Sequence, residues 1–285
     1  MRKYKVVRGK QMFNPSFLNR LVEIYQNYLL ENPVGVYLHG SLAMGCYHPE
    51  YSDIDILVVV RDKISRATKK RLIQEILRLE QEYPEHKLEM SILLNKYLID
   101  FHYPTPFELH YSDLYKPTYQ NHPNFLCEGD VDPDLAAHCV VTKHRGITLF
   151  GKDNLEVFPD INPGYYIQSI LNDIEDAPKN ITKNPIYFSL NLCRVLYYLK
   201  KGVIASKKEG GEWAVSKIPD TYTELINIAL DHYAGKNERT DWDHSQLIEF
   251  AEFMLKEINQ ELNTEHIKQP DSCLGGKNIE EILRS

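Results

Sequence analysis

Two aspartates spaced one residue apart are the part of this sequence best suited to chemistry. Asp53 and Asp55 stand at the start of the apolar, β-branched run 54–60, which is typical of a strand buried on both faces. Because side chains alternate along a strand, both carboxylates project from the same face. Two carboxylates this close repel each other unless a cation lies between them or one is protonated. A hard divalent cation such as Mg²⁺ suits these oxygen ligands, so the pattern predicts a metal site.

A glycine turn precedes the aspartates. Residues 34–39, Val-Gly-Val-Tyr-Leu-His, predict a strand that ends at Gly40. Glycine at the end of a strand lets the backbone approach a ligand closely, and a helix that starts there directs its N–H groups at an anion. A phosphate-binding turn beside a metal-binding aspartate pair predicts a site for a nucleoside triphosphate.

A third carboxylate stands inside another predicted strand. In the segment 87–94, KLEMSILL, the residues Leu88, Met90 and Ile92 share one face, and Glu89 lies on the other. Acidic residues are rare inside such strands and are seldom buried without a partner. Either this strand lies at a sheet edge with its second face in water, or Glu89 joins the two aspartates from a neighbouring strand.

The elements that must position these residues fall into two parts. Strand and helix patterns are mixed up to residue 157, whereas only helical patterns remain from residue 165 onward. We therefore predict an α/β (α+β) domain with a mixed sheet over residues 1–157, followed by an all-α helical-bundle domain over residues 158–285. Periodicity fails between residues 100 and 130, where we expect irregular loops with one short strand, a candidate lid or acceptor-binding segment.

Composition narrows the class of protein. The 285 residues carry a net charge of −7, contain no apolar run of membrane-spanning length, and begin without the apolar core of a signal peptide. The five cysteines are scattered, form no zinc-binding spacing and fit a reducing compartment. We expect a cytoplasmic monomer that binds neither membranes nor nucleic acid, since a basic aromatic groove is missing. The acidic charge is compatible with a small cationic partner.

Several motifs carry a resemblance to a known family. Gly40-Ser41, followed by Ser52-Asp53-Ile54-Asp55 at the start of an apolar strand, resembles the signature of the polymerase-β-like nucleotidyltransferase superfamily. Further landmarks are similar, in order, to those of the bacterial aminoglycoside adenylyltransferases that modify spectinomycin and streptomycin. They are Glu89 within LEMSI, DPDLA at 132–136, LFG at 149–151, LCRV at 192–195, GVIASK at 202–207, EWA at 212–214 and YAG at 233–235. The resemblance covers residues 34 to about 260, including the helical domain.

The resemblance implies transfer of AMP from Mg-ATP to a hydroxyl of an aminoglycoside or aminocyclitol, with release of pyrophosphate. It implies that the turn at Gly40, with Ser41 and Ser52, contacts the triphosphate. Asp53 and Asp55 would carry two magnesium ions.

The resemblance also assigns the remaining roles. Glu89 would be the general base. Arg194 and Lys207 would reach the phosphates from the second domain, and Tyr233 would help to hold the nucleotide. Two alternatives stay open: Arg194 and Tyr233 also suit ordinary surface or core positions, and Lys208 could replace its neighbour.

Two departures from the family bear on the acceptor. Streptomycin-modifying members place a tryptophan after an acidic residue where this chain has Ser112-Asp113-Leu114. Those members also have an acidic residue at the position that corresponds to about Asn184 of this chain. Both changes remove groups expected to hold the large cationic streptomycin, so we expect spectinomycin as the acceptor. Acidic side chains that could meet its ammonium groups are found at 173, 175 and 176, although a solvated acidic face explains them as well.

Other functions remain possible from the sequence. The chain could adenylylate another small hydroxyl substrate, or a protein in the manner of antitoxin-type nucleotidyltransferases, which are usually shorter and lack the second domain. A non-catalytic binding module is the third alternative, and the presence of Asp53, Asp55 and Glu89 together argues against it.

Overall fold

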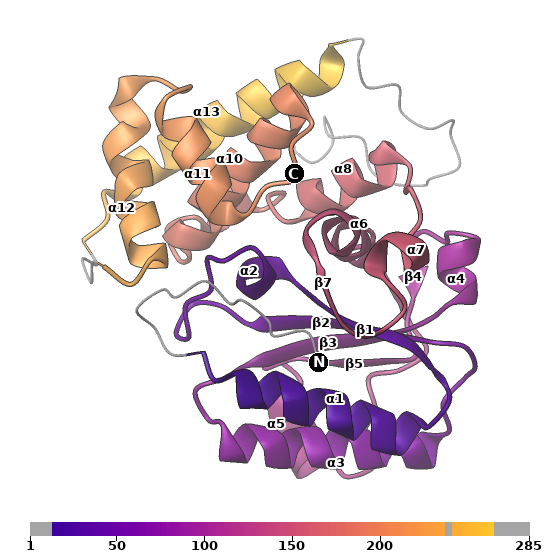
Figure 1. The fold of residues 1–285 in the computed structure, drawn as a ribbon. Coiled ribbons are helices and arrows are strands. Elements are labelled where there is room, and N and C mark those ends of the chain that lie inside the picture. The colour runs from indigo at the N-terminus through magenta and orange to yellow at the C-terminus, as the bar shows by residue number, and fades with distance from the viewer. Residues whose placement is uncertain (1–12, 237–240, 265–285) are drawn as a thin grey trace. The chain divides into compact units, whose positions relative to one another are not determined.

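The computed structural model describes residues 13–236 and 241–264. The chain divides into two compact units, Met1–Ile161 and Asn162–Ser285, whose elements are labelled in Figure 1. The first unit is built on a sheet and the second consists of helices.

The first unit contains a five-stranded mixed sheet with the order β5-β3-β2-β1-β7. Strands β2 and β3 are parallel, and the other neighbouring pairs are antiparallel. The strands are β1 (Pro33–His39), β2 (Ile54–Val60), β3 (Leu88–Leu94), β5 (Leu109–Tyr111) and β7 (Ile147–Gly151). The predicted mixed sheet is confirmed. Strand β3 lies between two others, so the interpretation of Glu89 as part of an edge strand is wrong.

Helices cover both faces of this sheet (Figure 1). Helices α1 (Pro15–Leu29) and α3 (Arg66–Glu82) pack on the face that carries Ile54, Ile56 and Val58. The opposite face carries Leu57 and Val59, which pack against α6 (Leu135–Arg145), with α4 (Lys96–Ile99) and α7 (Asn154–Val157) beside it. Burial on both sides explains why β2 is a continuous apolar run.

The segment between residues 100 and 132 is more ordered than its sequence predicts. It contains β4 (Thr105–Pro106), β5, α5 (Lys116–Asn121) and β6 (Val131–Asp132), and β4 pairs with β6. Backbone hydrogen bonds join Phe107 to Asp130 and Gly129, and His110 to Cys127. The one short strand expected here is present as β5, which joins the main sheet. The expectation that the rest is irregular is wrong, because partners distant in sequence supply its hydrogen bonds and β4 and β6 form a separate two-stranded sheet.

The second unit is all-helical, as predicted. Its elements are α8 (Pro163–Asn172), α9 (Ala177–Asn180), α10 (Pro185–Lys201), α11 (Lys207–Val215), the 3₁₀ turn η1 (Asp220–Tyr222), α12 (Thr223–Tyr233) and α13 (His244–Asn263). Helix α11 begins directly after Ser206, because Ser206 and Glu209 form a capping box there. A methyl group added to Gly210 would lie 2.7 Å from Arg194 Cα, so glycine allows α11 to pack closely on α10.

Within the described residues, no helix combines the length and the hydropathy that a membrane crossing requires.

Candidate active site

The turn at Gly40 joins the end of β1 to the short helix α2 (Gly40–Ala43). Gly40 has φ = +61°, which favours glycine, and a Cβ there would overlap the carboxylate oxygen Oδ2 of Asp55. Glycine therefore provides both the turn and the space for that carboxylate. The next side-chain hydroxyl, Ser41 Oγ, is buried and has no hydrogen-bond partner among the described residues.

Ser52 lies in the turn that leads into β2. Its hydroxyl oxygen accepts a hydrogen bond from the His48 backbone N–H at 3.2 Å, and its own N–H donates to the His48 carbonyl at 2.9 Å. The side chain is buried. These two bonds orient the backbone immediately before Asp53, so Ser52 has a local structural contact in addition to the phosphate contact predicted from the sequence.

The parallel pairing of β2 with β3 brings two of the predicted carboxylates together. Asp55 is the register partner of Glu89, and Leu57 is the partner of Ser91. Parallel neighbours are about 4.8 Å apart across a sheet. Both acidic residues are half-buried, on the sheet face that α6 covers further along. Asp53 lies two residues before Asp55 and hence on the same side.

Three histidines surround this carboxylate pair. His39 ends β1 opposite Asp55, and its ring centroid lies 4.9 Å from that of His138 in α6. His110 in β5 is paired with Ser91, and the distance between His110 Nδ1 and Ser91 Oγ is 2.9 Å. None of these three histidines was predicted from the sequence. The position of His39 directly before Gly40 was the one indication in the sequence that a histidine lies at this site. His110 and His138 gave no such indication, since they come from segments distant in sequence.

The charges in this group set the histidine pKa values. Burial lowers the pKa of His138, but the nearby carboxylates, led by Glu89, outweigh burial and raise it overall. Burial and the neighbouring His138 lower the pKa of His39. Burial also lowers the pKa of His110, although Glu89 and Asp132 oppose this shift. Of these three histidines, the one whose pKa is raised, His138, is thus the one on which the most carboxylates act.

The residues at this site suit a magnesium ion that is shared with a phosphate ligand. No group of three His, Cys, Asp or Glu side chains within residues 13–236 and 241–264 could hold a metal ion by itself. Mg²⁺ is ordinarily bound by one or two carboxylates together with substrate phosphates and water. Asp53 and Asp55 match the carboxylate part of that donor set, and the buried Ser41 hydroxyl without a partner among the described residues follows Gly40, whose Cβ position touches Asp55.

In the second unit, Arg194 and Lys207 belong to one connected set of contacts. Arg194 Nη2 donates to Asp173 Oδ2 at 2.7 Å, and the Tyr187 hydroxyl donates to Asp173 Oδ1 at 3.1 Å. Lys207 Nζ lies 4.8 Å from the centroid of the Tyr187 ring. By contrast, Lys208 pairs with Glu212 on the surface at 3.5 Å. Tyr233 is buried at the end of α12.

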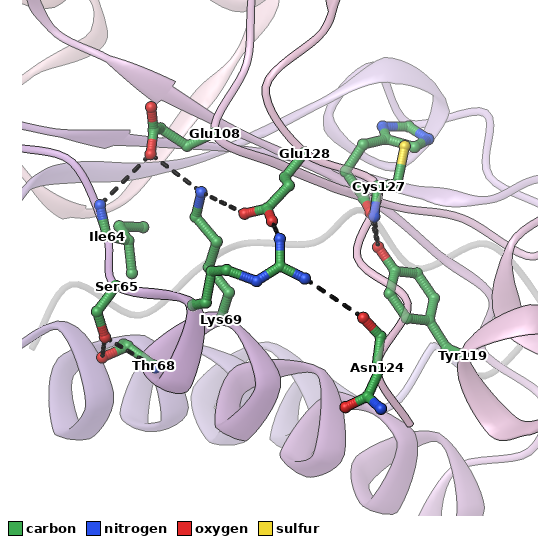
Figure 2. Close-up of polar contacts among 11 residues, drawn as sticks. Ile64, Ser65, Thr68, Lys69, Glu108, Tyr119, Asn124, Cys127 and Glu128 are labelled. Atoms are coloured by element: carbon green, nitrogen blue, oxygen red, sulfur yellow. Dashed lines mark hydrogen bonds and ion pairs between the residues drawn. The ribbon is translucent and has the colours of Figure 1, made fainter. Parts of the chain in front are cut away.

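The segment 107–130 is anchored to helix α3 by a buried ammonium group (Figure 2). Lys69 Nζ lies 3.2 Å from a carboxylate oxygen of Glu108 and 2.9 Å from one of Glu128, and its side chain is only 7% exposed. Arg66 also pairs with Glu128 and donates to the Asn124 carbonyl. These ion pairs therefore fix this part of the predicted lid to α3 within the first unit.

Lys69→Met is expected to lower the free energy of unfolding of the first unit by about 3 kcal/mol, because it leaves the buried carboxylate of Glu108 and the partly buried one of Glu128 without their shared cation. Both tryptophans, at 213 and 242, lie in the second unit, so tryptophan fluorescence does not report this loss directly. Urea unfolding followed by circular dichroism, with hydrogen exchange over residues 105–132, would measure it. Lys70→Met is the matched control, since Lys70 makes one hydrogen bond, to Asn124 at the surface. Equal effects of both substitutions would contradict the prediction.

Comparisons with known proteins match both units. A family model described as "Nucleotidyltransferase domain" matches residues 17–113, and one described as "Aminoglycoside adenylyltransferase, C-terminal domain" matches residues 156–257. A spectinomycin 9-adenylyltransferase of Staphylococcus aureus is 25% identical over 235 residues, covering 81% of this chain and 89% of the relative. An aminoglycoside (3'') (9) adenylyltransferase of Klebsiella pneumoniae is 26% identical over 255 residues, covering 85% and 94%.

The fold is also similar to a solved structure. A spectinomycin adenyltransferase AAD(9) from an Enterococcus species, crystallised with ATP and spectinomycin, gives a TM-score of 0.73 at 22% identity. The match covers 87% of this chain and all of that one.

Proposed function

Because this chain belongs to the aminoglycoside adenylyltransferase family, we propose that it transfers AMP from ATP to a hydroxyl of spectinomycin or a related aminocyclitol, releasing pyrophosphate. The observation that best supports this proposal is the register pairing of Asp55 with Glu89, next to the Gly40 turn. Asp55 suits a metal ion, and Glu89 suits the acceptance of a proton. Adenylylation of a hydroxyl requires both.

The first unit would hold the donor. Asp53 and Asp55 would bind magnesium, which when present neutralises charge on the phosphates and lowers the pKa of a bound hydroxyl. The buried Ser41 hydroxyl, which lacks a partner among the described residues, would donate to a phosphate oxygen. Ser52 would do the same while its oxygen accepts from the turn. The positive φ at Gly40 would let the backbone approach the triphosphate closely.

Glu89 would accept the proton from the acceptor hydroxyl. As the acceptor oxygen bonds to the α-phosphorus, the bond from that phosphorus to the pyrophosphate oxygen breaks, and pyrophosphate leaves with the electron pair. The hydroxyl proton passes to the Glu89 carboxylate, which needs to be within hydrogen-bond reach of it. The partial burial of Glu89 supports this role, since a half-buried carboxylate is shielded from water but still accessible to a ligand.

The second unit would contribute cations for the phosphates. Arg194 can donate to phosphate oxygens through its planar guanidinium, and Lys207 can supply a compact positive charge. Their connection through Asp173 and Tyr187 favours Lys207 over Lys208 for this role. Tyr233 would help to hold the nucleotide.

The acceptor is tested by a pyrophosphate-release assay with Mg-ATP and a panel that contains spectinomycin and streptomycin. We expect release with spectinomycin and none above background with streptomycin, because Leu114 and Asn184 occupy positions where streptomycin-modifying relatives have the groups described above. Turnover of streptomycin alone would overturn the acceptor assignment. No release with any member of the panel, together with AMP adducts on co-expressed proteins, would overturn the small-molecule proposal.

A further inference from the structure

We propose that Asp173 is a positioning residue that holds the Arg194 guanidinium for contact with the phosphates of ATP, an inference that rests on the function proposed above. Asp173 follows the last residue of α8, and Arg194 lies in α10. The sequence presented Asp173 as an acidic residue that could meet the ammonium groups of the acceptor. Its contacts in the second unit point to a different role.

Both carboxylate oxygens of Asp173 are engaged inside the unit. Oδ2 accepts from Arg194 Nη2 at 2.7 Å, and Oδ1 accepts from the Tyr187 hydroxyl at 3.1 Å. The Asp173 and Arg194 side chains are 19% and 20% exposed. Charge-assisted hydrogen bonds in such partly buried places are stronger and better defined than exposed ion pairs. An acceptor ammonium group at Asp173 would have to compete with both partners.

Packing between two helices fixes the backbone of Arg194, as the bond to Asp173 fixes its side chain. A Cβ on Gly210 would lie 2.7 Å from Arg194 Cα and 2.8 Å from its backbone nitrogen, so α11 lies directly against α10 at this residue. With the main chain held by packing and the guanidinium by Asp173, Arg194 loses little conformational freedom when it binds an anion. The guanidinium donates to Asp173 through Nη2, and its planar group of N–H donors suits the oxygens of a phosphate.

The same cluster places the second cation. Tyr187 stands two turns before Arg194 on the same face of α10, since seven residues separate them. Its hydroxyl contacts Asp173 while its ring faces Lys207 Nζ at 4.8 Å. One carboxylate and one aromatic ring therefore hold an arginine and a lysine in a single constellation.

The test compares Asp173→Ala with Asp173→Asn, because the asparagine keeps an oxygen that can accept from Arg194. We expect Asp173→Ala to weaken Mg-ATP binding about tenfold by calorimetry and Asp173→Asn about threefold, in line with the loss of a charge-assisted hydrogen bond. The KM for ATP should rise by the same factors, while the KM for the acceptor and the thermal midpoint stay within about twofold and a few degrees of wild type. Asp220→Asn, the same charge change at an exposed residue of the unit, should leave ATP binding unchanged.

A double-mutant cycle shows whether Asp173 acts through Arg194. In an Arg194→Ala background, Asp173→Ala should change ATP affinity by less than about twofold, because its partner is already absent. Equal effects in both backgrounds would overturn the proposal. Tighter ATP binding by Asp173→Asn would also overturn it, because this would mean that repulsion between Asp173 and phosphate is dominant. A change confined to the KM of the acceptor would overturn it as well. Absence of Mg-ATP binding by the wild-type protein would instead contradict the proposed function itself.

Discussion

Glu89→Gln is expected to slow AMP transfer by about 10³-fold while Mg-ATP binding stays near the wild-type value, as for loss of a general base. The amide has nearly the shape of the carboxylate but cannot accept a proton at neutral pH. Glu89 is the register partner of Asp55, so glutamine changes the chemistry of the position without creating a cavity in the sheet. Single-turnover kinetics with saturating ATP and spectinomycin would measure the chemical step, and calorimetry would measure the binding.

The matched control for this substitution is Glu82→Gln, at an exposed residue at the end of α3. It makes the same chemical change away from the carboxylate group and should leave transfer within about twofold of wild type. Near-normal turnover by Glu89→Gln would remove Glu89 as the base. Loss of ATP binding in the same variant would point to a role in holding the donor instead.

The central part of this site could be predicted because its residues are close in sequence or lie on regular strands. The β-branched run after Asp53 identifies β2, and alternation along β3 puts Glu89 on the face opposite Leu88. Alternation does not give the order of strands, however. It left open whether β3 lies at an edge, and the sheet order resolves this by placing β5 beside it.

The remainder depends on contacts between distant segments. His110 and His138 approach Glu89 from β5 and α6, and no local pattern in the sequence links them. The bond between Asp173 and Arg194 joins residues 21 positions apart, one directly after α8 and the other in α10. The two carboxylate partners of Lys69 come from residues 108 and 128, far from it in the sequence. Local propensity could not supply these partners, because tertiary packing selects them.

Asp53→Asn is expected to weaken magnesium-dependent ATP binding by about 100-fold or more, which corresponds to about 2.7 kcal/mol. An amide oxygen is a poorer ligand for Mg²⁺ than a carboxylate and does not neutralise its charge, and the donor set here has only two aspartates. Within the described residues no group of three His, Cys, Asp or Glu side chains could hold a metal ion by itself, so losing one aspartate removes a large part of the protein's share of the ligands. Calorimetric titration with ATP in magnesium and in EDTA would separate the metal-dependent part of the affinity.

Three further measurements make this prediction specific to the metal. Asp55→Asn should give a comparable loss, since Asp55 projects from the same face. Asp62→Asn, at an exposed residue just after β2, should bind ATP normally and controls for the change in net charge. Wild-type protein in EDTA should bind ATP about as weakly as Asp53→Asn does in magnesium, because both conditions remove the same contact. An unchanged ATP affinity in Asp53→Asn would contradict the metal site, whereas equal losses in all three variants would mean that charge, and not coordination, governs the binding.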